Sequence, residues 1–162
     1  MVRTFAAAIV LVAAGTPAVL AGQQSTSAPP ATYVSAAELI EVLKKAGDRP
    51  AIDTTAQSVV AGSNNVLVNI GHRTKAGATM EGVAHSDLTE VYHVIEGAGT
   101  VVTGGTFVNP QQAGANTRGT IQNGRSQRVA AGDVVVIPVG TPHTFSDIES
   151  TVVFLNIRIN PK

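Results

Sequence analysis

From Ile52 to its end, the chain is a series of short segments rich in Val, Ile and Thr, separated by Gly, Asn and Pro. The first group of residues favours strands and the second favours turns, so the pattern is typical of many short β-strands. No second helical pattern of useful length and no solenoid repeat interrupts it. The sequence predicts an all-β sandwich or barrel over 51–162. We expect its strands to include 90–95, 99–103, 121–123, 133–137, 143–145 and 151–159.

Three segments precede this region. Residues 1–21 place Arg3 before a short apolar run that ends at small residues, which is the layout of a secretory signal peptide. The run is too short to cross about 30 Å of hydrocarbon, although an uncleaved membrane anchor is the alternative. Residues 22–32 are small, polar and Pro-containing, as in a flexible linker. We therefore expect a secreted or periplasmic protein.

One short helix is expected over 36–46, within the segment 33–47. Ser35 and Glu38 have the spacing of a capping box. Lys44 suits the C-terminal end of the helix, and Gly47 suits its stop. Further along, residues 107–127 contain much Gly, Asn and Gln and few apolar residues, so we expect a long hairpin excursion outside the core.

The composition excludes several functions. Eleven basic and eleven acidic residues cancel, and no run of like charge occurs, so neither a nucleic-acid footprint nor a polybasic membrane patch is present. The chain has no cysteine, so it forms no disulfide and offers no thiol for lipidation. We expect a small molecule or another protein as the partner.

A carboxylate lies within one of the expected strands. Alternation places Glu90 and Tyr92 on one face of this strand and His93 on the other. If the first face is the interior, Glu90 needs a cation, hydrogen-bond donors or water beside it, because an unpaired buried charge is costly. A metal is one such partner, and His85 lies close enough in the chain to reach the same point.

A second histidine follows a tight turn. Pro138, Gly140 and Pro142 predict this turn, and His143 opens the strand after it, with Phe145 on the same face. A histidine held beside a rigid turn suits metal binding, since a preorganised ligand loses little freedom when the ion arrives.

The strand "NVLVNIGHRT" carries a further histidine. Alternation places His72 on the face of Val68 and Ile70. We therefore expect His72 to point into the interior. Arg73 and Asp147 are expected at the surface or in turns.

The segment around His143 resembles the second conserved motif of the cupin superfamily, G-x5-P-x-G-x2-H-x3-N. Gly132, Pro138, Gly140 and His143 match this motif in register, and only its last position differs, with Asp147 in place of Asn.

The first cupin motif is matched in part, and the resemblance as a whole covers 66–159. His85, Glu90 and Gly97 fit the pattern, its opening glycine falls on Gly77, and its first histidine falls on Val83.

The resemblance implies a cupin-type double-stranded β-helix, a jelly-roll barrel, with a divalent metal held by the motif histidines and glutamate. Carried over by position, the ligands are His85, Glu90 and His143, whereas Val83 cannot bind metal. Either three ligands suffice, as in two-histidine, one-carboxylate iron sites, or His72 supplies the fourth, which we favour. Nitrogen and carboxylate donors suit Fe, Mn, Ni or Zn alike.

The residues also admit an interpretation without metal. His143 and Glu90 can form a buried hydrogen-bonded pair, His85 can lie in a solvent-exposed loop, and His72 can be a core histidine. Tyr92 and Phe145 are expected to line the pocket, although a core position would explain Tyr92 equally well.

Three functions remain open at this stage. The first is a metal-dependent enzyme of dioxygenase or isomerase type that acts on a small organic molecule. The second is a non-catalytic module that binds or senses a small molecule without metal. The third is an assembly role, in which the outward face of Val91, His93 and Ile95 pairs with a second subunit. Cupins often dimerise, so we expect a homodimer, which can coexist with either of the first two functions.

Overall fold

The computed structural model describes residues 30–61 and 64–161. The chain divides into two units, Met1–Ala31 and Thr32–Lys162, and the second contains every described helix and strand. The predicted signal peptide and most of the predicted linker lie outside the described residues. Among the helices that are described, none has the length and apolar character needed to cross a membrane.

Helix α1 spans Ala36–Lys45, one residue less than expected at its C-terminal end. The Ser35 hydroxyl accepts a hydrogen bond from the Glu38 backbone N–H at 3.1 Å, which caps the first turn. Gly47 adopts a φ of 83° just after the helix, a conformation that glycine reaches without a Cβ penalty. The helix contacts strands β1 (Ala51–Ala61) and β2 (Asn64–Arg73).

Replacing Ser35 with alanine should therefore lower the free energy of unfolding by about 1 kcal/mol, because the capping hydrogen bond is lost. Urea denaturation followed by circular dichroism measures this change. Ser35→Asp is the control, since aspartate also caps helices well and should retain the stability of the wild type.

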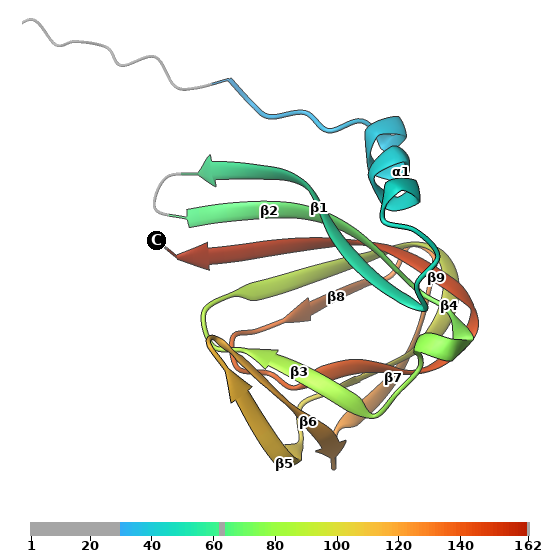
Figure 1. The fold of residues 1–162 in the computed structure, drawn as a ribbon, viewed down its shortest axis with the longest axis vertical. Helices are drawn as coiled ribbons and strands as arrows, with labels where there is room; N and C mark the ends of the chain where they lie inside the picture. The colour runs from blue at the N-terminus through green and yellow to red at the C-terminus, as the bar shows by residue number, and fades with distance from the viewer. Residues whose placement is uncertain (1–29, 62–63, 162) are drawn as a thin grey trace, which may run out of the picture. The chain divides into compact units, whose positions relative to one another are not determined.

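Two long strands, β4 (Thr89–Thr103) and β9 (His143–Pro161), organise the fold (Figure 1). They pair antiparallel from Thr89 opposite Ile159 to Thr103 opposite His143, with several bulges along the way. Bulges bend strands, and here the bends divide both strands into two halves that pair with different neighbours, while all nine strands form one hydrogen-bonded sheet.

The remaining strands add to these halves. They are β3 (Glu81–His85), β5 (Thr106–Ala113), β6 (Asn116–Gln122), β7 (Arg125–Ala130) and β8 (Val134–Ile137). The bends fold this one hydrogen-bonded sheet into two layers, called the first and the second sheet. The first has the order β1, β2, β9, β4, β8, and the second has the order β5, β6, β3, β9, β4, β7. A short 3-10 turn, Lys75–Gly77, connects β2 to β3.

This arrangement confirms the predicted all-β jelly roll with one short helix. The hydrogen-bonded ladder does not close into a continuous barrel, because β1 and β5 pair on one side only among the described residues. The core lies between the two sheets, and its cluster consists of Tyr92, Val94, Val101, Val129, Ile137, Phe145, Ile148, Val152 and Phe154.

Residues 107–127 agree with the prediction only in part. They form β5, β6 and the start of β7, and Ile121 is buried at 2% exposure. The expected hairpin is present, because β5 and β6 pair antiparallel and most of their residues are not buried. The expectation that it lies outside the core was wrong at Ile121, because β6 buries alternate residues, which its low overall apolar content concealed.

Candidate metal centre

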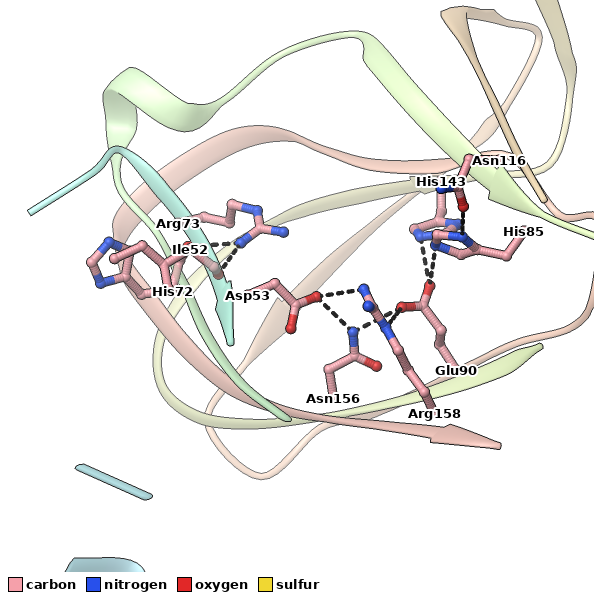
Figure 2. Close-up of polar contacts among 10 residues, drawn as sticks. All are labelled: Ile52, Asp53, His72, Arg73, His85, Glu90, Asn116, His143, Asn156 and Arg158. Atoms are coloured by element: carbon pink, nitrogen blue, oxygen red, sulfur yellow. Dashed lines mark hydrogen bonds and ion pairs between the residues drawn. The ribbon is translucent and has the colours of Figure 1, made fainter. Parts of the chain in front are cut away.

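Three of the predicted ligands meet between the two sheets (Figure 2). Glu90 comes from the first half of β4, His85 from the end of β3, and His143 from the start of β9. One ligand atom from each lies within 4.8 Å of the other two. Glu90 and His143 are buried, and 10% of the His85 side chain is exposed.

Both histidine rings are oriented by hydrogen bonds at Nδ1. His143 Nδ1 donates to the Thr141 carbonyl at 2.9 Å, and His85 Nδ1 donates to Asn116 Oδ1 at 2.6 Å. A neutral imidazole with its proton on Nδ1 has a lone pair on Nε2. The second nitrogen of each ring is thus available as a metal ligand, as is usual for histidines at metal sites.

The two Nε2 atoms face one carboxylate oxygen. Glu90 Oε2 lies 2.8 Å from His143 Nε2 and 3.5 Å from His85 Nε2. Bare lone pairs repel at 2.8 Å, so a proton or a cation must lie between them. A proton on His143 Nε2 would satisfy that contact alone and would leave the buried His85 Nε2 without a partner.

A divalent transition metal fits this site better than a proton. The donor set consists of two imidazole nitrogens and one carboxylate oxygen, which suits such ions. A metal would also engage the buried His85 Nε2, which otherwise lacks a hydrogen-bond partner, together with Glu90 Oε2.

The other carboxylate oxygen of Glu90 is fixed from behind. Glu90 Oε1 accepts hydrogen bonds from Asn156 Nδ2 and Arg158 Nε, each at 2.8 Å. The same two residues donate to Asp53 Oδ2, also at 2.8 Å each. Burial alone would raise the pKa of Glu90, but His143, Asn156 and Arg158 outweigh it and lower the pKa to about 2. Glu90 is therefore an ionised carboxylate whose second oxygen is directed at the histidines.

A cavity of about 260 Å³ adjoins the cluster. His85 and His143 line it together with Tyr92 and Phe145, whose rings are parallel with centroids 6.1 Å apart. Burial, together with the charges of Glu90 and Asp53, raises the pKa of Tyr92 well above its ordinary value, so its phenol is neutral. The cavity thus combines the ligand cluster with an aromatic wall.

The family model for cupins matches residues 57–162. The chain belongs to the cupin family. This confirms the resemblance drawn from the motifs around Glu90 and His143.

Several solved structures are similar to this chain. A Rhizobium leguminosarum protein of unknown function has a TM-score of 0.51 at 11% identity, with coverage of 83% of this chain and 100% of that one. BH2720 from Bacillus halodurans has a TM-score of 0.48 at 18% identity, with coverage of 82% and 84%. KdgF from Halomonas sp. has a TM-score of 0.48 at 14% identity, with coverage of 71% and 84%. No curated protein matches the chain.

The structure does not bring His72 to this cluster. Its Nε2 donates to the Arg49 carbonyl at 2.6 Å instead. The expectation that His72 points inward was wrong, because β2 carries apolar residues on the face away from the cavity, where Ile70 is buried outside the core cluster. Helix α1 contacts β2, so the apolar face of β2 need not be the face that points into the cavity.

The position of the missing cupin histidine does face the site. Val83 pairs directly with His143 across β3 and β9 and lines the cavity. An apolar side chain therefore occupies the place of a fourth ligand, and the described residues provide three.

The residues that hold Glu90 were not predicted from the sequence. Asn156 and Arg158 are spaced by two in the strand "FLNIRI", so both point into the interior with Phe154. Two polar residues at alternate positions of an otherwise apolar strand are a detectable signal of a buried polar cluster. Arg73, expected at the surface, is half-buried and also lines the cavity.

Proposed function

We propose that this cupin binds one divalent transition metal through His85, Glu90 and His143 and acts on a small organic molecule in the adjoining cavity. The observation that carries the proposal is the convergence of two Nε2 atoms and one carboxylate oxygen, in which the buried His85 Nε2 has no hydrogen-bond partner and Glu90 Oε2 faces both histidines. Fe, Mn, Ni and Zn all suit these donors.

The protein's own contribution is positioning. Thr141 and Asn116 fix the orientation of the two imidazoles, while Asn156 and Arg158 hold the Glu90 carboxylate. A bound metal would supply a Lewis acid able to polarise a substrate oxygen. Oxidation or isomerisation is the reaction class that we propose, on the basis of family membership alone.

A non-catalytic cupin that binds a small molecule without metal is the second candidate. It is favoured by Val83, which removes one ligand of the usual cupin set. Metal content separates the two candidates directly.

Elemental analysis of the untagged protein beside two histidine variants tests the proposal. We expect about one equivalent of transition metal in the wild type and less than about a tenth of this in His143→Ala, because one of three ligands is lost. His93→Ala is the control, since His93 is exposed and outside the cluster, and it should retain the metal. A wild-type protein that stays empty after incubation with Fe, Mn, Ni and Zn would contradict the proposal.

We also propose that the protein is exported, from the layout of residues 1–21. Mass spectrometry of protein recovered outside the cytoplasm should give a mass without this segment. A mass that includes the segment would contradict cleavage.

A further inference from the structure

The cavity beside the candidate metal centre contains arginine residues that the proposed ligand set does not use. Three arginines line it, namely Arg73, Arg118 and Arg158. Arg158 forms ion pairs with Asp53 and Glu90, so its charge is matched. Arg118 is exposed, and its charge is solvated. Arg73 is half-buried and has no carboxylate within ion-pair distance among the described residues.

The guanidinium of Arg73 is held by one nitrogen only. Its Nη1 donates to the Ile52 carbonyl at 2.6 Å and to the His72 carbonyl at 2.8 Å (Figure 2). The remaining nitrogens, Nε and Nη2, form no hydrogen bond with the described residues. These two atoms form one edge of the planar guanidinium, and such an edge binds a carboxylate through two parallel hydrogen bonds. An anchored arginine with an unused edge is preorganised for an anion.

Aromatic rings connect Arg73 to the metal ligands. The Arg73 guanidinium carbon lies 5.2 Å from the centroid of Phe154 and 6.0 Å from that of Phe145. The Tyr92 ring packs against both phenylalanine rings and lies edge-on to the His143 ring, with 6.1 Å between the centroids of Tyr92 and His143. A molecule that reaches from Arg73 to the cluster passes along this aromatic wall, which favours an apolar middle part.

Charge and size narrow the ligand further. One unmatched guanidinium balances the single charge of a carboxylate, whereas a phosphate monoester carries about −1.5 to −2 at neutral pH. The cavity of about 260 Å³ is smaller than the roughly 300–1,000 Å³ of pockets for drug-sized ligands. These features favour a small monocarboxylate over a sugar phosphate or an oligosaccharide.

We propose that Arg73 is a substrate-binding residue that anchors the carboxylate of a small monocarboxylic acid. In this arrangement the apolar body of the acid lies along Tyr92 and Phe145, and its far end reaches His85 and His143. The placement of the far end rests on the metal-binding function proposed above. The carboxylate subsite stands on Arg73 and is testable without metal.

The test compares 4-hydroxyphenylacetate with its neutral analogue 4-hydroxyphenylacetamide by calorimetry on the chelator-treated protein. The two probes differ in charge at one end and share an aromatic body and a hydroxyl at the other. We expect the acid to bind wild type at least about tenfold more tightly than the amide, as a charge-assisted bidentate pair predicts. Equal affinities, or no binding of either probe, would overturn the proposal without any variant being made.

Two variants assign the preference to a residue. Arg73→Gln should reduce the acid-to-amide ratio to below about threefold, whereas Arg118→Gln, which removes the exposed arginine, should leave it unchanged. An unchanged ratio in Arg73→Gln together with a reduced ratio in Arg118→Gln would overturn the assignment to Arg73.

Circular dichroism monitors the folding of Arg73→Gln, because Arg73 also donates hydrogen bonds to two backbone carbonyls. Should Arg73→Gln not fold, Arg73→Lys decides: the loss of the planar edge should weaken acid binding several-fold, and unchanged binding would overturn the proposal.

Metal content keeps the two proposals separable. Arg73→Gln should retain the metal content of the wild type, since Arg73 contacts none of the proposed metal-binding residues. A wild-type protein that takes up no metal but still prefers the acid would refute the metal function and leave the carboxylate subsite standing. A wild-type protein that binds metal but does not prefer the acid over the amide would refute the carboxylate subsite and leave the metal function standing.

Discussion

Glu90→Ala is expected to lower the free energy of unfolding by about 3 kcal/mol and to abolish the proposed metal binding. The substitution deletes the acceptor for Arg158 Nε and for Asn156 Nδ2, and it removes the carboxylate ligand of the cluster. Removing one partner of a buried ion pair typically costs about 3–5 kcal/mol. We place this case at the lower end, because Arg158 is 26% exposed and keeps its ion pair with Asp53. Urea denaturation and elemental analysis on the same preparations measure the two effects.

Glu90→Gln separates stability from metal binding. Glutamine keeps a carbonyl oxygen for Arg158 and Asn156, but it presents an NH₂ group instead of Oε2 to the histidines. This variant should therefore retain most of the wild-type stability and still lose the metal. A full equivalent of metal in Glu90→Gln would exclude Glu90 as a ligand. Wild-type stability in Glu90→Ala would show that the contacts with Arg158 and Asn156 do not stabilise the fold.

The sequence predicted those parts of the site in which one strand or one turn determines the geometry. Alternation within a single strand placed Glu90 and Tyr92 on the same face, and both are buried in the structure. The turn at Pro138 and Gly140 placed His143 at the start of a strand, and β9 begins there. Such local rules involve few residues and do not depend on what packs against the strand.

The other parts depended on contacts between distant segments. His72 was assigned to the interior from the apolar character of its strand face, but the sequence does not show that helix α1 contacts the same strand. The hydrogen bonds from Arg158 to Asp53 and to Glu90 join residues separated by 105 and 68 positions. Pairing between such distant strands follows from the sheet topology, which alternation within one strand does not specify.

Gly97→Ala is expected to have the second large effect, although Gly97 lies outside the cluster. Its φ is 82°, and an added Cβ would clash with the Thr151 carbonyl on the paired strand β9. The left-handed conformation alone costs a residue with a Cβ roughly 1–2 kcal/mol. With the clash, we expect the free energy of unfolding to fall by about 3 kcal/mol or more, as measured by urea denaturation.

Gly104→Ala is the matched control for this substitution. Gly104 has a similar φ of 73°, but a Cβ there would meet no atom within 4 Å. It should lose only about 1–2 kcal/mol from the backbone conformation. Equal destabilisation of the two variants would show that the close approach of β4 and β9 at Gly97 has no energetic importance.

Gly97→Ala should also weaken metal binding, since Gly97 lies at the bulged bend where β4 passes from one sheet to the other. Glu90 belongs to the first sheet, whereas His85 and His143 belong to the second. The ligand atoms therefore converge only if the bends in β4 and β9 hold the two sheets at the correct separation. We expect at least about a tenfold weaker metal affinity for Gly97→Ala and wild-type affinity for Gly104→Ala, measured by competition with a chelator at a temperature where both are folded. Unchanged affinity in Gly97→Ala would mean that the cluster forms independently of this bend.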